Sequence, residues 1–175
     1  MVRLEGDRVI LRAVREDELE TVWQASQSLD ERVQPTGPPS RTEARDRLDR
    51  SGRLVKGQVD LGIEADGRLI GEIQARGRPA QALPPGVFEL GVVLWDTGDR
   101  GKGFGAEAVA LITSWLFEEA GAGRVQATTE VGNAAMRRAL EKCGYAFEGV
   151  LRAYMPYRDG RDDYAMYAIA ADDPR

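Results

Sequence analysis

The polar and apolar positions of this chain follow two spacings, one typical of helices and one typical of strands. Apolar residues three or four positions apart predict four helices, over residues 16–29, 41–53, 104–121 and 133–144. Short apolar or alternating runs predict seven strands, over residues 9–12, 59–65, 68–75, 87–95, 124–129, 145–155 and 164–170. The resulting order, β-α-α-β-β-β-α-β-α-β-β, indicates one α+β or mixed α/β domain over residues 1–175.

Local chemistry marks several of these elements. Asp66-Gly67, between two predicted strands, is typical of a tight hairpin turn. Ser40, with Glu43 three positions later, has the pattern of a capping box at the start of the second helix. The strongly apolar run at 87–95 predicts a central strand, whereas the few large apolar residues at 41–53 predict a peripheral helix.

Composition narrows the chemistry that such a domain can perform. The chain has no histidine, which excludes histidine-based triads, imidazole bases and the usual histidine-containing zinc sites. Its only cysteine, Cys143, cannot form an internal disulfide, which fits a reducing cytoplasm. No apolar run reaches the roughly 20 residues that span a bilayer, and a formal charge of −5 argues against nonspecific nucleic-acid binding. We therefore expect a cytoplasmic domain with no metal and no membrane or nucleic-acid partner.

A glycine-rich turn lies between the strand at 87–95 and the longest predicted helix. Its residues are Arg100, Gly101, Lys102, Gly103, Phe104 and Gly105. Alternating glycines leave consecutive backbone N–H groups uncovered, and a helix that begins at Gly103 or Phe104 adds the positive end of its dipole. Arg100 and Lys102 carry positive charge beside the same turn. The motif therefore predicts a binding site for a pyrophosphate.

Two other interpretations fit the same residues. The first is a tight strand-to-helix turn that binds nothing. The second is a dinucleotide-binding turn, in which Gly101, Gly103 and Ala106 match Gly-x-Gly-x-x-Ala. Glu130, at the end of the next predicted strand, would then bind the ribose. A nicotinamide enzyme is disfavoured because residues 96–100 separate the strand from the first glycine, and only 45 residues follow Glu130, too few to complete a doubly wound sheet.

Taken with the segments around it, the glycine turn resembles the GNAT superfamily of acyl-CoA-dependent N-acetyltransferases. Arg100-x-x-Gly103-x-Gly105 is similar to that family's pyrophosphate loop, and the segment Asn133 to Tyr145 is similar to its second CoA-contacting helix. Further segments resemble its branch of ribosomal-protein N-terminal acetyltransferases of the Rim type: Leu11-Arg12 with Glu16-Asp17, Glu148 to Arg152, and Gly160 to Tyr167. The resemblance covers nearly the whole chain. It implies a central, twisted, mostly antiparallel sheet of about seven strands flanked by about four helices.

The resemblance also implies a cosubstrate, acetyl-CoA, with its pyrophosphate on the backbone N–H groups of residues 101–105. Val92, Val93 and Leu94 would present backbone groups to the pantetheine arm, which would lie beside the strand like an added β-partner. Asn133 would form a hydrogen bond with the end of the pantetheine arm, serve as a plain helix N-cap, or do both.

The chain departs from the family pattern at two positions. Met136 stands where a small residue is usual, and Leu140 stands where many members carry a general-acid tyrosine. The chain thus lacks a dedicated proton donor for the leaving thiolate, although a thiol with a pKa of about 8 to 9 can leave as an anion. These positions keep a second interpretation open, a non-catalytic acyl-CoA-binding sensor or scaffold. Arg137 and Arg138 either reach the cofactor's 3′-phosphate or are ordinary exposed helix arginines.

The implied reaction is direct attack of a neutral amine on the thioester, without an acyl-enzyme. The acceptor is a primary amine, either a protein N-terminus or a small molecule. Because it arrives as an ammonium, a base has to remove a proton. Glu89 is the first candidate and Glu72 the second, since desolvation on an apolar strand would raise the pKa of either carboxylate; the alternative for each is a solvent-facing position.

We expect the segment 34–39 and the helix before it to shape the acceptor pocket. Trp23 either lines this pocket or lies in the core, and we favour the core. The sequence leaves open whether the protein is a monomer or a homodimer.

Overall fold

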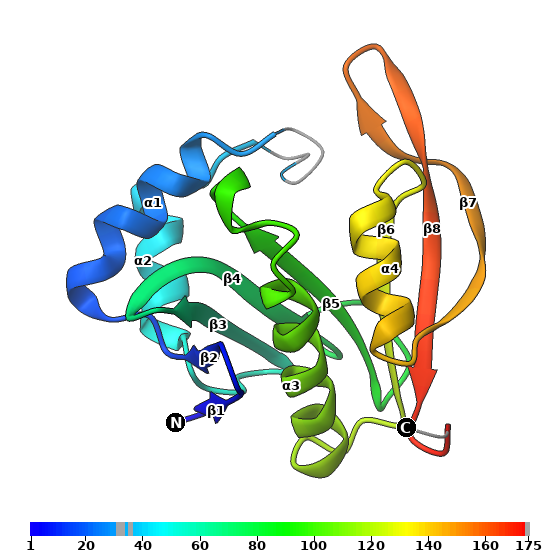
Figure 1. The fold of residues 1–175 in the computed structure, drawn as a ribbon, viewed down its shortest axis with the longest axis horizontal. Coiled ribbons are helices and arrows are strands. Elements are labelled where there is room, and N and C mark those ends of the chain that lie inside the picture. The colour runs from blue at the N-terminus through cyan, green and yellow to red at the C-terminus, as the bar shows by residue number, and fades with distance from the viewer. Residues whose placement is uncertain (31–33, 35–36, 174–175) are drawn as a thin grey trace.

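The computed structural model describes residues 1–30, 34 and 37–173 of the chain. Within them, eight strands form one sheet in the order β1-β2-β3-β4-β5-β6-β8-β7, and four α-helices flank it (Figure 1). The strands are β1 (Leu4–Glu5), β2 (Ile10–Arg12), β3 (Gln58–Ala65), β4 (Arg68–Arg76), β5 (Val87–Leu94), β6 (Arg124–Glu130), β7 (Ala146–Tyr157) and β8 (Gly160–Ala170). The helices are α1 (Leu19–Gln27), α2 (Arg41–Arg50), α3 (Phe104–Glu118) and α4 (Ala134–Lys142), with short 3-10 helices η1 (Glu16–Glu18) and η2 (Thr97–Asp99).

All neighbouring strands run antiparallel except β5 and β6, which are parallel. The expected α+β fold, with a mostly antiparallel sheet and four helices, is confirmed. The sheet has one strand more than the seven segments that the pattern indicates, because β1 has two residues, too few to show an alternating pattern. The helix predicted over 16–29 divides into η1 and α1. The helix predicted over 41–53 ends at Arg50, because Gly52 adopts a φ of 74° that no helix residue has.

Three local predictions are confirmed. Asp66 and Gly67 have φ of 50° and 74°, as a tight hairpin turn between β3 and β4 requires. Ser40 and Glu43 form the expected capping box at the start of α2, and Ala44 is the one fully buried residue of that peripheral helix. The strand predicted to be central, β5, lies inside the sheet between β4 and β6. None of the helices described is long and apolar enough to cross a membrane.

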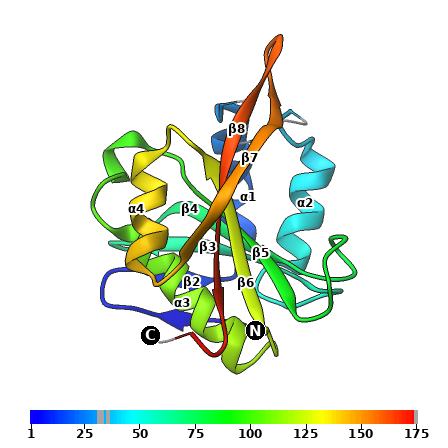
Figure 2. The same ribbon diagram turned by 90° about the vertical axis from the view of Figure 1, so that its right-hand side faces the viewer.

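The part of the sheet from β3 to β5 has two chemically different faces, because successive side chains of a strand alternate between them. One face is apolar and packs against α3, whose buried residues include Ala108, Ile112 and Leu116. The opposite face lies toward α2, which Figure 2 shows on the other side of the sheet from α3. The strand register places several polar side chains on this second face, among them Asp60, Glu72, Gln74, Arg76 and Glu89.

Arg12 of β2 anchors the segment that leads into α1. Its side chain is buried and donates hydrogen bonds to both carboxylate oxygens of Glu18, at 2.7 and 2.8 Å, and to Glu64 of β3 at 2.6 Å. The hydrogen bonds to Glu18 raise the pKa of Arg12, although burial acts in the opposite direction. Arg15 pairs with Glu18 at 2.6 Å and lies 3.7 Å from Glu64, so two arginines compensate the two carboxylates.

Removing Arg12 would leave two largely buried carboxylates, Glu18 and Glu64, with only the half-exposed Arg15 as a cationic partner. We expect Arg12→Ala to lower the free energy of unfolding by about 3–5 kcal/mol. Arg3→Ala is the control, since Arg3 pairs with Glu5 while both side chains are more than half exposed; its expected cost is at most about 1 kcal/mol. Urea denaturation followed by circular dichroism measures both values, and equal losses in the two variants would contradict the prediction.

Candidate active site

Strands β5 and β6 pair along only part of their length. Their parallel register runs from Val87 opposite Arg124 to Leu90 opposite Ala127 and then stops. Beyond this point β5 remains paired with β4 up to Leu94, while β6 remains paired with β8. The two strands therefore diverge, and a cleft of about 740 Å³ opens between them.

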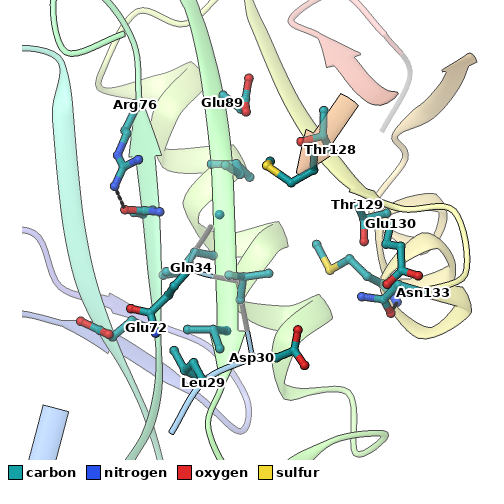
Figure 3. Close-up of a pocket in the computed structure, with 18 of the residues that line it drawn as sticks. Leu29, Asp30, Gln34, Glu72, Arg76, Glu89, Thr128, Thr129, Glu130 and Asn133 are labelled. Atoms are coloured by element: carbon teal, nitrogen blue, oxygen red, sulfur yellow. Dashed lines mark hydrogen bonds between the residues drawn. The ribbon is translucent and has the colours of Figure 1, made fainter. Parts of the chain in front are cut away.

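Figure 3 shows side chains from three parts of the chain around this cleft. Glu72, Arg76 and Glu89 come from β4 and β5, whereas Glu130 and Asn133 lie on the opposite side, at β6 and the start of α4. The end of α1 adds Ser26, and the segment after it adds Leu29, Asp30, Gln34 and Gly37. The segment 34–39 and the preceding helix, predicted to shape an acceptor pocket, thus border the cleft at Ser26, Gln34 and Gly37, while positions 35 and 36 lie outside the described part of the chain.

Trp23 is not in the core, contrary to expectation. Its indole N–H donates to the carbonyl of Pro39 at 3.3 Å, and the guanidinium of Arg41 lies 4.2 Å from the centre of its ring. The side chain is half-buried between α1 and α2 and does not border the cleft. Helical spacing predicted that Trp23 faces inward from α1. The residues that pack against it come from the start of α2 and not from the sheet.

The edge of β5 that faces the cleft offers unpaired backbone groups. The N–H of Trp95 donates to the carbonyl of Ile70 on β4 at 3.1 Å. Because backbone groups alternate between the two edges of a strand, Val93 is also directed toward β4, whereas Val92 and Leu94 are directed toward the cleft. Two of the three residues predicted to bind the cofactor through their backbone thus face the open side, and Val93 contributes its side chain to the cleft wall.

The glycine turn has the geometry of a backbone anion site. Gly101 and Gly103 have φ of 76° and 90°, a left-handed conformation that favours glycine, and α3 begins at the next residue, Phe104. No described residue accepts a hydrogen bond from the backbone N–H groups of residues 101–105. A Cβ on Gly105 would meet no atom closer than Cδ1 of Leu94, at 4.0 Å, so the side of the turn next to β5 is open. These donors and the positive end of α3 are available to a phosphate.

Two residues, Arg8 and Asp99, hold the glycine turn in place. Arg8 donates to the carbonyl of Lys102 at 2.6 Å and to the carboxylate of Glu107 at 3.0 Å. Asp99 is buried and pairs with Arg68 at 2.5 Å and with Lys102 at 3.6 Å. The hydrogen bond from Arg68 holds the pKa of Asp99 below its usual value. Arg8 and Arg68 lie 94 and 31 positions from these partners, so no local pattern could have identified them.

The cationic residues of the turn play different parts. Lys102 is held by Asp99, whereas the exposed Arg100 borders the cleft and donates to the carbonyl of Leu94 at 3.1 Å. Arg100 therefore links the open edge of β5 to the glycine turn and keeps its charge at the mouth of the cleft.

The start of α4 is a capped helix end at the rim of the cleft. Asn133 Oδ1 accepts a hydrogen bond from the N–H of Met136 at 3.1 Å, which is the N-cap expected from the sequence. Asn133 and Met136 both border the cleft, whereas Leu140 is fully buried in the core. Arg137 donates to the hydroxyl of Tyr167 at 3.1 Å, so its guanidinium is engaged within the protein.

The two candidate bases have different surroundings. Glu89 accepts a hydrogen bond from the side-chain amide of Gln126 at 3.0 Å, where β5 and β6 are still paired. Glu72 also borders the cleft, but no described residue forms a hydrogen bond or an ion pair with its carboxylate. Burial raises the pKa of Glu72 to about 7, although Arg47 acts in the opposite direction. A carboxylate of this kind can gain or lose a proton near neutral pH.

Known proteins share the family model and the fold of this chain. A family model described as an acetyltransferase (GNAT) domain matches residues 8–146. A Bacillus subtilis protein described as the uncharacterized N-acetyltransferase YoaA is 32% identical over 95% of both chains. The structure of a GNAT-family acetyltransferase from Bacillus anthracis has a TM-score of 0.78, at 21% identity over 98% of this chain and 99% of that one. RimL, a ribosomal alpha-N-protein acetyltransferase in complex with coenzyme A, has a TM-score of 0.79, at 18% identity over 99% of this chain and 100% of RimL.

Gly105 allows the open side of the turn to be tested without disturbing the fold. We expect Gly105→Val to weaken binding of coenzyme A at least about tenfold, because a side chain there would block close approach to the free N–H groups. Stability should be unchanged or slightly higher, since valine has a better helix propensity than glycine. Ala110→Val, at an exposed position of the same helix, is the control. Calorimetry measures the affinity, and an unaltered Kd in Gly105→Val would argue against a phosphate site at this turn.

Proposed function

Because the chain belongs to the GNAT acetyltransferase family, we propose that it transfers an acetyl group from acetyl-CoA to a primary amine. The family resemblance seen in the sequence is confirmed by these matches. One observation carries the proposal: the open edge of β5 leads directly to the free N–H groups of residues 101–105 at the start of α3. Such a row of donors suits a ligand with an amide-containing arm and a pyrophosphate, which is the chemistry of coenzyme A.

In this proposal acetyl-CoA lies along β5. Its pyrophosphate binds the backbone N–H groups of the turn, with Arg100 beside it. Its pantetheine arm pairs with the backbone of Val92 and Leu94 as an added strand. Asn133, on the opposite wall, turns its side-chain NH₂ toward the end of the arm while Oδ1 caps α4. The thioester then lies between the wall that carries Glu72 and the start of α4.

The proposed reaction is a direct transfer. The neutral amine nitrogen bonds to the thioester carbonyl carbon, the carbon–sulfur bond breaks, and the amine proton passes to a base. Met136 and Leu140 have no proton to donate, so CoA leaves as a thiolate and takes its proton from solvent, as a thiol with a pKa of about 8.5 allows. Cys143 takes no part as a nucleophile, because burial raises the pKa of its thiol, which donates to the carbonyl of Ala106 at 3.2 Å.

We assign the role of base to Glu72. Its carboxylate has no partner among the described residues and has a pKa of about 7, whereas Glu89 is engaged by Gln126. An α-amine with a pKa near 8 is partly neutral at pH 7, so a base of this strength suffices to remove its proton. Glu89 is assigned instead to holding β5 and β6 together where they still pair.

Thiol release from acetyl-CoA, followed with mass spectrometry of the product, tests the proposed function. The acceptors are small amines and short peptides, the latter included because RimL is described as an alpha-N-protein acetyltransferase. We expect release with at least one class of primary amine and none with a tertiary amine of similar size. Binding of acetyl-CoA without release from any acceptor would instead favour a non-catalytic acyl-CoA-binding sensor.

The role of Glu72 predicts a specific pH dependence. A base has to be ionised to accept a proton, so kcat should rise with pH up to about 7 and level off above it. We expect Glu72→Gln to lose this rise and to lower kcat by about 10²- to 10⁴-fold, with the Kd for acetyl-CoA unchanged. A weakly basic acceptor amine keeps its own titration out of the range measured. Glu89→Gln is the matched control and should retain the rise; a rise retained in Glu72→Gln would exclude Glu72 as the base.

A further inference from the structure

Two arginine side chains border the cleft on the side away from the glycine turn. Arg47 comes from α2 and Arg76 from β4, and both are half-buried. Arg76 donates to the neutral side-chain amide of Gln74 at 2.6 Å. Within the described part of the chain, Arg47 forms neither a hydrogen bond nor an ion pair. Two guanidinium groups therefore reach the cleft without a carboxylate partner.

The other arginines of α2 are each paired with an acid. The pairs are Arg41 with Glu20 at 3.1 Å, Arg45 with Glu16 at 2.6 Å, and Arg50 with Asp60 at 3.1 Å. A cation that is partly removed from water is stabilised by an anion that shares its surroundings. Arg47 is the exception on this helix, and it is the arginine of α2 that borders the cleft.

Arg76 and Arg47 share one region of the protein. Burial lowers the pKa of Arg76; the charges of Arg47 and Arg50 act in the same direction, whereas Asp60 and Glu89 oppose it without forming an ion pair with Arg76. Asp60 itself is already engaged by Arg50 at 3.1 Å. An anionic group placed between the two guanidinium groups would offset their repulsion and accept hydrogen bonds from their unused N–H donors.

The phosphates of the cosubstrate are not suited to this role. Arg76 lies opposite Glu89 in the β4–β5 register, whereas the glycine turn follows Leu94 at the other end of β5. Five strand residues span about 17 Å. A pyrophosphate bound at the turn therefore does not reach the two arginines, and their remaining N–H donors stay available to an anionic group of the second substrate.

We propose that Arg47 and Arg76 bind an anionic group of the acceptor, which is then a small amine that carries a carboxylate or a phosphate in the same molecule. This inference rests on the proposed function, since it identifies the acceptor of that reaction. Glu72 lies on the same face of β4 as Arg76, four positions before it. The amine end is placed at Glu72 and the anionic end at the arginines, so the acceptor is oriented in one direction. Polyamines and simple alkylamines have no anionic group with which to contact the two arginines.

The wild-type protein gives the first test. Acetylation is measured for a series of ω-amino carboxylates, from glycine to 6-aminohexanoate, and for their neutral amides, above pH 8 where Glu72 is ionised. We expect kcat/KM for the best carboxylate to exceed that of its amide by at least about tenfold. Aminoalkyl phosphates of the same length then distinguish a carboxylate site from a phosphate site. The length at which the preference is largest reports the distance from Glu72 to the arginines.

Variants of the two arginines give the second test. Arg47→Gln and Arg76→Gln should each reduce the carboxylate-to-amide preference by about tenfold or more, up to its complete loss. The ratio is compared because Arg47 also influences Glu72, and that influence acts on both substrates alike. Arg45→Gln, on the same helix but paired with Glu16 at the surface, is the control and should leave the preference unchanged.

The outcomes separate the two proposals. A wild-type ratio near one overturns the inference, and this measurement does not depend on whether a variant folds. A clear preference that survives both arginine variants, or a preference for peptides whose N-termini carry no acid, also overturns it. Absence of thiol release with every acceptor overturns the proposed function itself, and the assignment of an acceptor subsite with it.

Discussion

The cleft of this protein depends on one constraint: β5 and β6 pair through four residue pairs and then separate. Each strand keeps its other neighbour, so the separation leaves the pairing with β4 and β8 intact. Unpaired backbone groups inside a sheet are normally unfavourable, because their N–H and C=O groups lose their partners. Here the edge of β5 that has no strand partner includes Val92, which borders the cleft, and leads toward the glycine turn. The donors that the sheet leaves unused are therefore the ones that a ligand can use.

The alternation of side chains on β3, β4 and β5 gives the cleft its chemistry. Their apolar face packs on α3 and supplies most of the core, so the fold is stabilised without the polar face. The polar face then holds groups that a core could not accept, among them Glu72 and Arg76, and α2 adds Arg47 opposite them. α2 covers this face with only Ala44 fully buried, which leaves a partly hydrated compartment in which charges are desolvated but still reachable.

Local sequence was sufficient for features that depend on a few neighbouring residues. The hairpin at Asp66-Gly67, the left-handed glycines of the turn before α3 and the cap at Asn133 all follow from conformations that particular residue types favour. The two-residue strand β1 could not be predicted, since it is too short to alternate. Trp23 was misplaced because helical spacing identifies an inward face but not the element that covers it.

By itself the sequence determined the order of the elements, the α+β class and the turn at the start of α3, because periodicity and glycine conformation act over short stretches of chain. Only the tertiary structure decided which acid is desolvated and unpartnered. Glu72 and Glu89 are both single acids in apolar strands, and Gln126, which occupies Glu89, is 37 positions away in the chain. Arg8, which braces the glycine turn, is 94 positions from Lys102. The burial of a side chain and the charges around it depend on several segments that come together only when the chain folds. No local sequence pattern therefore encodes them.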